Sequence, residues 1–411
     1  MISEPIIRAG ILGAADSQYI LHGEFQQTED ADKSMVFRPL SNDAYFTLPN
    51  VKIGIGFHWE RVEPQSFHGA LRICPDGLMI NEIAVEEYLR SVISSEMKAT
   101  APMEFLKAHA ILSRSWLMAM LDRKESEQNN LKRKYTAAHL ENNVDKELGC
   151  HEVIKWYDRE SHNHFDICTD DHCQRYQGIS REISQEADRA VRETRGIVLT
   201  FNGKVCDARF SKCCGGTTEE FSTAWESIDV PYLKSIRDIA PNGEYYCATN
   251  DRKLLESILN GYDLASPDFF DWKEQLSQAE LTDLLLNKGD INLGKIIELR
   301  PLSRGKSRRI CRLLIKGTEG SLIVGKELEI RRLLSPTHLK SSSFDVTPLD
   351  SFGNPITNNS IPESFIFSGH GWGHGVGLCQ IGAAAMASKG ADYKTILNHY
   401  FSNAELTPLY N

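Results

Sequence analysis

Glu96 of the 411-residue chain lies at a position where a carboxyl could act as a general acid. Val85, Leu89 and Val92 recur at helical spacing and predict one apolar helix face, which Glu96 continues four residues after Val92. Burial on that face and the negative end of the helix dipole both favour a protonated carboxyl, which a general acid needs near neutral pH. The alternative is a glutamate at the rim of the face that points into solvent, as most charged side chains do.

Residues 369–391 form a second stretch that could carry out chemistry or bind a ligand. In it, five glycines alternate with His370, Trp372, His374 and Val376. Glycines at a period of two predict a backbone that is pressed against a ligand, a neighbouring strand or a metal shell. A tight turn from strand to helix, in which glycine only permits close packing, explains the same pattern. The spacing matches neither a dinucleotide-binding fingerprint nor a phosphate loop.

Residues 162–178 concentrate the soft nitrogen and sulfur donors that zinc prefers. The donors are His162, His164, Cys168, His172 and Cys173. Four residues separate the two cysteines, which is wider than a usual zinc knuckle but within the reach of a loop. Spacing alone does not fix which histidine would complete a site.

Cys213 and Cys214 are adjacent, and adjacent cysteines rarely bridge to each other because the geometry is strained. They could belong to a second metal site or pair with distant cysteines. Buried free cysteines most often act as small hydrophobes, and that is the expectation for Cys74, Cys311 and Cys379. Ten cysteines in 411 residues do not make a disulfide scaffold.

A long helix that begins near residue 101 is predicted to lie at the centre of the fold. Thr100 and Pro102 signal its start, and apolar residues then cover nearly its whole circumference, which is typical of a buried helix. Arg114 and His109 lie inside it, and a buried charge needs a partner. Arg114 could hold a carboxylate or a ligand, but a structural ion pair is the favoured explanation for a single buried arginine.

The rest of the chain predicts an α+β fold in which a central buried helix accompanies mostly antiparallel strands. Four regions are expected: β-rich residues 1–84, a core at 85–249, a helical segment and strand meander at 250–345, and the glycine-rich loop with C-terminal helices at 346–411. Within the core, the charged residues 122–160 are expected to form a solvated helix or an exposed insertion. Asp392 is predicted to cap the final helix.

Several blocks in this order resemble the SpoIID/LytB family, that is, stage II sporulation protein D and the amidase enhancers. The resemblance runs from about residue 66 to the end of the chain. The blocks are 86–97 (EEYLRSVISSEM), 102–116 (PMEFLKAHAILSRSW), 167–178 (ICTDDHCQRYQG), 190–204 (AVRETRGIVLTFNGK), 215–220 (GGTTEE) and 369–401. The pair Cys213 and Cys214 departs from the family pattern, in which serine and threonine are commoner before the glycine pair.

The resemblance implies a peptidoglycan lytic transglycosylase in which Glu96, in the Ser-Glu-Met motif, is the catalytic acid and base. It further implies a structural zinc ion, for which His162, Cys168 and Cys173 are the nearest ligands and the fourth is open. The residues expected to line or support the glycan site are Arg114, Gln174, Tyr176, His370, His374 and Gln380. Glu219 and Glu220 lie in a polar turn and are expected to be solvated or to act indirectly, and either could alternatively orient the glycan.

Two other classes of function compete with the transglycosylase. A non-catalytic amidase enhancer would bind cell wall or a partner amidase, and the retained Glu96 favours the enzyme over it. A zinc-dependent hydrolase using His370 and His374 with the cysteine cluster is the weakest, because histidines four apart in a glycine loop lack the helix that fixes a metalloprotease pair.

The composition of the chain limits which binding partners and which cellular location we expect for the protein. The net charge of −10 argues against bulk nucleic-acid binding, and no run of 18 apolar residues predicts a membrane span. Residues 1–23 read as a strand and not as a signal peptide, because charged residues come early and apolar residues alternate. The family's substrate lies outside the cytoplasmic membrane, so export to the periplasm or cell surface is expected although no signal peptide is visible.

Overall fold

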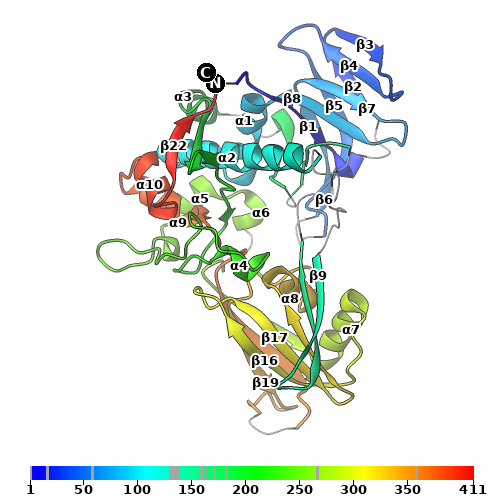
Figure 1. The fold of residues 1–411 in the computed structure, drawn as a ribbon, viewed down its shortest axis with the longest axis vertical. Coiled ribbons are helices and arrows are strands. Elements are labelled where there is room, and N and C mark those ends of the chain that lie inside the picture. Colours follow the sequence, from blue (N-terminus) through cyan, green and yellow to red (C-terminus); the bar gives the residue numbers. More distant parts are fainter. Residues whose placement is uncertain are drawn as a thin grey trace.

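The protein folds into two lobes that have separate hydrophobic cores (Figure 1). The computed structural model describes residues 2–14, 18–56, 60–128, 139–157, 162, 164–170, 173–180, 184–264, 268–356 and 360–411. Within these ranges, the upper lobe of Figure 1 consists of residues up to 128, 162–270 and 371–411. The lower lobe consists of 139–157 and 271–370, so the chain enters it twice.

The upper lobe begins with two sheets, as the alternating apolar residues of 1–84 predict. One has the order β11-β1-β8-β7-β4-β3 and is antiparallel except between β1 and β11; the other has the order β2-β5-β6. The strands are β1 (Ile6–Gly10), β2 (Ile20–His22), β3 (Phe25–Glu29), β4 (Met35–Pro39), β5 (Tyr45–Ile53), β6 (Arg61–Phe67), β7 (Ala70–Ile73), β8 (Met79–Ala84) and β11 (Ile167–Cys168). A 3-10 turn, η1 (Leu12–Ala14), follows β1.

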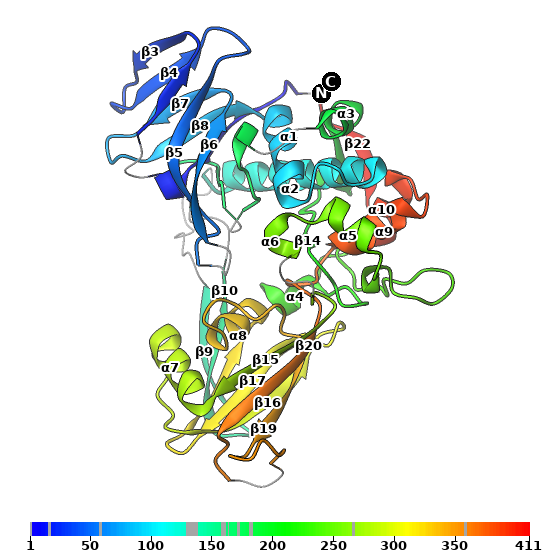
Figure 2. The same ribbon diagram turned by 180° about the vertical axis from the view of Figure 1, so that it is seen from behind.

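Helix α2 (Met103–Gln128) crosses the middle of the upper lobe and is buried along its first five turns, as predicted (Figure 2). Helices α1, α3, α9 and α10 pack against it. The upper-lobe helices are α1 (Val85–Glu96), α3 (Gln185–Glu193), α4 (Phe221–Ala224), α5 (Arg252–Ile258), α6 (Gly261–Leu264), α9 (Gln380–Ser388) and α10 (Tyr393–Tyr400), with 3-10 turns η2 (Gly178–Ser180) and η3 (Tyr246–Ala248). Asp392 caps α10 by accepting a hydrogen bond from the Thr395 backbone N–H, 2.8 Å away, as expected.

Short strands complete the upper lobe and bring the chain ends together. The order β13-β12-β22 joins β12 (Ile197–Phe201), β13 (Lys204–Val205) and β22 (Glu405–Pro408), and β14 (Phe210–Ser211) pairs with β21 (Leu378–Cys379) in parallel. The Ile2 N–H donates to the Leu409 carbonyl at 3.2 Å, and both termini lie at the end of the molecule away from the lower lobe (Figure 1).

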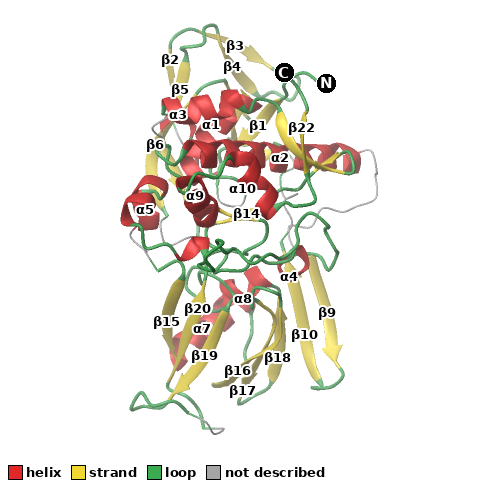
Figure 3. Ribbon diagram, turned by 90° about the vertical axis from the view of Figure 1, so that its left-hand side faces the viewer, coloured by secondary structure: helices red, strands yellow, loops and turns green. Residues whose placement is uncertain are grey.

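The lower lobe consists of long strands beside two helices (Figure 3). A five-stranded sheet has the order β16-β17-β18-β10-β9, and a three-stranded sheet has the order β15-β20-β19. The elements are β9 (His139–Asp145), β10 (Cys150–Trp156), β15 (Asp271–Ser277), β16 (Ile296–Arg304), β17 (Ile310–Gly317), β18 (Ser321–Gly325), β19 (Phe344–Leu349), β20 (Ser364–His370), α7 (Gln278–Gly289) and α8 (Glu327–Leu333). Most strand pairs are antiparallel in both lobes, which confirms the α+β prediction.

Residues 139–145 and 150–156 are strands and not the solvated helix that was one of the two expectations for 122–160, whereas the alternative of an exposed insertion stays a prediction. Helix α2 continues to Gln128, and β9 and β10 then form the edge of the five-stranded sheet. Ile154 and Trp156 are buried two positions apart, so β10 has a strand periodicity that the neighbouring run of charges conceals. Among the described residues, no helix is both long and apolar enough to cross a membrane.

Candidate functional site

Glu96 is the last residue of α1, and its side chain is buried, since the residue is 8% exposed. The Arg175 backbone N–H donates a hydrogen bond of 2.9 Å to Glu96 Oε1. Met97 then takes an extended conformation that ends the helix. The predicted burial at the C-terminal end of an apolar face is therefore confirmed, and the solvent-exposed rim position is wrong.

Buried charges surround the end of α1. Lys212 Nζ donates to the Glu96 carbonyl oxygen at 3.1 Å and pairs with Asp263 Oδ2 at 2.9 Å. Arg175 Nη1 lies 3.7 Å from the same Asp263 oxygen. Asp263 is thus an ion-pair partner of both Lys212 and Arg175. The positive charge of these two side chains lies close to Glu96. Such charge would stabilise a carboxylate that has given up its proton.

Three of the predicted zinc ligands come together beside this site. Their ligand atoms, on His162, Cys168 and Cys173, all lie within 4.8 Å of one another. His162 Nε2 is 3.3 Å from Cys173 Sγ, which also accepts a hydrogen bond of 3.4 Å from the Cys168 backbone N–H. His172, which was also considered, lies outside the described residues. The fold therefore places together the three donors that the sequence favours.

Gln174 and Tyr176 hold the segment that connects this donor group to Glu96. Tyr88 Oη donates to Gln174 Oε1 at 3.1 Å, and Tyr176 Oη donates to Asn81 Oδ1 at 2.6 Å. Both residues are at most 1% exposed. Because Arg175 lies between them, these bonds fix the backbone N–H that contacts Glu96. As placed, Gln174 and Tyr176 position the segment, and their predicted contact with substrate stays a prediction.

Arg114 takes part in a buried ion pair in the core. Its Nε and Nη2 donate to the two carboxylate oxygens of Glu86 at 2.8 and 2.7 Å, and its Nη1 donates to the Ile197 carbonyl at 2.9 Å. Tyr410 Oη also donates to Glu86, at 2.7 Å. Arg114 is fully buried, so the structural ion pair considered from the sequence is present. Direct contact between Arg114 and a glycan is not provided by this placement.

The glycine-rich loop packs against the backbone of residues 209–215. A ligand, a neighbouring strand and a metal shell were the predicted partners of this loop, and the structure shows a neighbouring strand. Leu378 is paired with Phe210, and Trp372 exchanges backbone hydrogen bonds with Cys213. The Arg309 guanidinium, which is fully buried, donates to the carbonyls of Gly373 and Cys214 at 3.0 Å each. The loop is thus held between the two lobes.

Replacing Gly377 with alanine is expected to destabilise the fold more than the same change at Gly353. Both have a positive φ, +75° and +80°, but a Cβ at Gly377 would lie 2.1 Å from the Arg209 carbonyl oxygen, whereas none lies within 4 Å at Gly353. Gly353→Ala should cost about 1–2 kcal/mol of left-handed strain, and Gly377→Ala about 1–3 kcal/mol more from overpacking. Urea unfolding measures both. Equal losses would mean that the contact with Arg209 is unimportant.

The two loop histidines have different surroundings. His370 is exposed at the end of β20, and its Nδ1 is 2.5 Å from Asp271 Oδ1. His374 is half-buried; its Nδ1 accepts from the Val376 N–H at 3.0 Å, and burial together with Arg209 lowers its pKa well below the usual value. Among the described residues, neither histidine belongs to a group of donors that could hold a metal. The zinc-dependent hydrolase therefore has no support in this geometry.

Gln380 and His109 form a buried polar pair between α9 and α2. Gln380 Nε2 lies 3.0 Å from His109 Nε2, and Ser113 Oγ lies 3.3 Å from His109 Nδ1. Both members of the pair are at most 2% exposed. Burial, with a smaller effect of Lys212, lowers the pKa of His109 to about 3. Gln380 thus contacts a neutral core histidine, and its predicted contact with substrate stays a prediction.

The buried His109 makes stability depend on pH. In the unfolded chain its pKa returns to about 6.5, so below that pH the unfolded state binds a proton that the native state excludes until about pH 3. From pH 7.5 to 5.5, His109 should therefore lower the free energy of unfolding by about 1.4 kcal/mol. Urea unfolding measures this free energy at both pH values. Between them, the free energy of unfolding of His109→Gln should fall by about 1.4 kcal/mol less than that of the wild type. His151→Gln, at an exposed position on β10, is the control and should keep the wild-type dependence.

Glu219 is a buried residue whose role the sequence did not reveal. Of the two expectations, a solvated position is wrong because Glu219 is fully buried, and an indirect role stays a prediction. Its carboxylate accepts from the Lys306 and Ser307 backbone N–H groups at 3.0 Å each, and its own N–H donates to the Gly375 carbonyl at 2.8 Å. Glu219 thereby connects the glycine loop to the β16–β17 turn of the lower lobe. Its partners are about 90 and 160 residues away, so no local signal identifies it.

Residues 76–201 match the family model described as Stage II sporulation protein, which covers α1, α2 and the Cys/His segment. Residues 219–377 match a domain of unknown function, DUF8618. One region of the chain is therefore similar to stage II sporulation proteins, and a second region is similar to a family of unknown function.

Relatives at low identity agree with this class. An uncharacterized protein of Brachyspira hyodysenteriae is 25% identical over 83% of this chain and 72% of its own length. Stage II sporulation protein D of Bacillus subtilis is 24% identical over 80% of this chain and 76% of its own. The amidase enhancer of Bacillus subtilis is 27% identical over 54% of this chain but only 33% of its own. The chain is thus similar to members of the SpoIID/LytB family.

Proposed function

We propose that the protein cleaves the glycan strands of peptidoglycan as a lytic transglycosylase, with Glu96 as acid and base. The observation that carries the proposal is the buried Glu96 carboxyl, held by the Arg175 N–H in the Ser-Glu-Met motif at the end of α1. A carboxyl held in this way can serve as a general acid that donates a proton to a leaving oxygen. Asp263, the neighbouring acid, is already paired with Lys212 and Arg175.

A single carboxyl is sufficient for this reaction. Protonated Glu96 donates its proton to the glycosidic oxygen between N-acetylmuramic acid and N-acetylglucosamine as that bond breaks at C1. The resulting Glu96 carboxylate removes the proton from the C6 hydroxyl of the muramic acid while O6 bonds to C1. The product is a 1,6-anhydro sugar, and Glu96 is again protonated. A hydrolase would need a second carboxylate to activate water or attack the sugar, and Asp263 is not free to do so.

A zinc ion held by His162, Cys168 and Cys173 forms part of the proposal. One imidazole nitrogen and two sulfurs within 4.8 Å of one another suit this metal, and the fourth ligand is open. When bound, zinc would supply a structural crosslink. It would fix the start of the segment that carries Arg175, and with it the hydrogen bond to Glu96.

The second candidate is a non-catalytic amidase enhancer that binds cell wall or a partner amidase. It is favoured by the relative named amidase enhancer, which aligns with about half of this chain. In either case the substrate or partner lies outside the cytoplasmic membrane, so we propose that the protein acts in the periplasm or at the cell surface.

Mass spectrometry of peptide-stripped glycan strands, incubated with the purified protein, separates the two candidates. New 1,6-anhydro-muramyl ends support the transglycosylase, and new reducing ends would indicate hydrolysis instead. If no ends form, while the protein increases the rate of an added cell-wall amidase, the enhancer is correct.

A further inference from the structure

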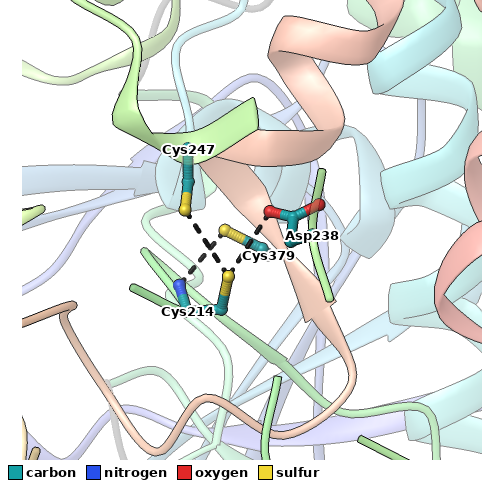
Figure 4. A group of neighbouring side chains, drawn as sticks. All are labelled: Cys214, Asp238, Cys247 and Cys379. Carbon is teal, nitrogen blue, oxygen red and sulfur yellow. Dashed lines mark hydrogen bonds between the residues drawn. The ribbon is translucent and has the colours of Figure 1, made fainter. Parts of the chain in front are cut away.

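A second group of metal-binding side chains lies in the core of the upper lobe, apart from the Cys/His segment (Figure 4). Cys214, Asp238, Cys247 and Cys379 are each at most 2% exposed. One ligand atom from each lies within 4.8 Å of all the others. The four residues come from the loop after β14, the segment before η3, η3 itself and the start of α9.

The spacing of the donors suits one ion. Cys214 Sγ lies 3.5 Å from Cys247 Sγ and 3.4 Å from Asp238 Oδ2. In a tetrahedral zinc site with Zn–S of about 2.3 Å and Zn–O of about 2.0 Å, neighbouring sulfurs are about 3.8 Å apart and a sulfur and an oxygen about 3.5 Å. A small inward or outward movement of the side chains would therefore accommodate the metal.

Hydrogen bonds from neighbouring backbone and side-chain groups orient the donors and leave the inward-facing atoms available. Asp238 Oδ1 accepts from Tyr400 Oη at 2.8 Å and lies 3.2 Å from His399 Nε2, so that Oδ2 faces the sulfurs. Cys379 is the N-cap of α9, and its sulfur accepts from the Gly382 N–H at 3.4 Å and the Cys214 N–H at 3.2 Å. Outer hydrogen bonds of this kind are typical of metal ligands.

Gly382 is adapted to the approach of the carboxylate. A Cβ at this position would lie 2.3 Å from Asp238 Oδ2 and 2.5 Å from Tyr400 Oη. His399 and Tyr400 contact Oδ1 of Asp238, whereas Oδ2 faces the sulfurs. Cysteines that act only as small hydrophobes do not explain why a buried carboxylate oxygen is directed at them. A disulfide between Cys214 and Cys247 would leave the same carboxylate and Cys379 unexplained.

We propose that Cys214, Asp238, Cys247 and Cys379 bind one zinc ion as a closed, structural site. Three sulfurs and one oxygen fill the tetrahedron, so no position is left for water or substrate. The ion would fasten the end of the glycine-rich loop to η3 and to the loop after β14. The site does not depend on the reaction proposed for Glu96 and would persist if that proposal were wrong.

Zinc content measured by elemental mass spectrometry on the full chain tests the proposal, in a Cys173→Ser background that removes a ligand of the other group. One equivalent of zinc should remain bound. Adding Cys379→Ser or Asp238→Asn should remove it, and adding Cys206→Ser, a matched buried cysteine outside the group, should not. Asp238→Asn preserves side-chain size, and circular dichroism shows whether each variant is folded.

Cobalt(II) replacement in the Cys173→Ser chain provides a readout without further mutation, since thiolate-to-cobalt absorption reports on the sulfur ligands. A tetrahedral spectrum with intense thiolate bands is expected. A folded chain without zinc or cobalt, or a Cys214–Cys247 disulfide found by peptide mapping without reductant, would overturn the proposal.

Cys213 lies beside Cys247 and Cys379. Loss of zinc from Cys213→Ser with full retention in Asp238→Asn would overturn Asp238 as a ligand.

Discussion

Glu96→Gln should reduce the formation of 1,6-anhydro ends by about 10²–10⁴-fold, the usual contribution of a general acid. Glutamine keeps the size of the side chain and an oxygen that can accept from the Arg175 N–H. It has no acidic proton for the glycosidic oxygen and no carboxylate to remove the proton from O6. The fold should therefore remain while both proton transfers are lost. Mass spectrometry of digested glycan strands at matched protein concentration measures the change.

Glu87→Gln is the matched control for Glu96→Gln. Glu87 lies on the same helix, and its side chain is 44% exposed and paired with Arg90. Its replacement should leave the amount of anhydro product unchanged. If Glu96→Gln retained wild-type activity, Glu96 would not be the acid. If both variants and the wild type were inactive yet still accelerated an amidase, the enhancer function would hold.

Arg114→Met is expected to lower the free energy of unfolding by about 3–5 kcal/mol, which is the usual cost of leaving a buried charge without its partner. Glu86 would lose two hydrogen bonds of 2.8 and 2.7 Å and keep only the one from Tyr410 and a longer one from the Gly196 N–H. Methionine fills much of the arginine volume, so that the loss reflects charge more than a cavity. Urea or thermal unfolding monitored by circular dichroism measures the effect.

Two further variants interpret the Arg114 result. Arg192→Ala removes an arginine whose side chain is 68% exposed and should change stability by less than about 0.5 kcal/mol. The double variant Glu86→Leu/Arg114→Met should recover much of the loss, because no charge is then left unpaired. Wild-type stability in Arg114→Met together with weaker glycan binding would instead make Arg114 a direct substrate ligand.

Local patterns predicted the parts of the fold that depend on near neighbours. The apolar period of residues 85–96 identified α1 and the burial of Glu96, and an all-round apolar surface identified α2 as the central helix. The donor group of His162, Cys168 and Cys173 was found because all three lie within twelve residues of one another. In each case the signal is a spacing along the chain.

Long-range contacts account for what the sequence did not reveal. Cys379 was expected to be a small hydrophobe, and neither Asp238 nor Cys247 was selected, yet the fold places them beside Cys214 from positions up to 165 residues apart. Gln174 and Tyr176 matched a motif, but their buried partners on β8 and α1 depend on tertiary packing. The spacing of residues along the chain does not predict such tertiary contacts.

The double entry of the chain into the lower lobe also affects the order in which the protein can form. β10 leaves the ribosome early, but its parallel partner β18 follows about 170 residues later, since His151 pairs with Leu322. At about 5–20 residues per second, the β9–β10 hairpin would wait roughly 10–30 seconds with an unpaired edge. An exposed strand edge is a template for pairing with other chains. During synthesis the hairpin is therefore the segment at which a holding chaperone would protect the nascent chain from aggregation.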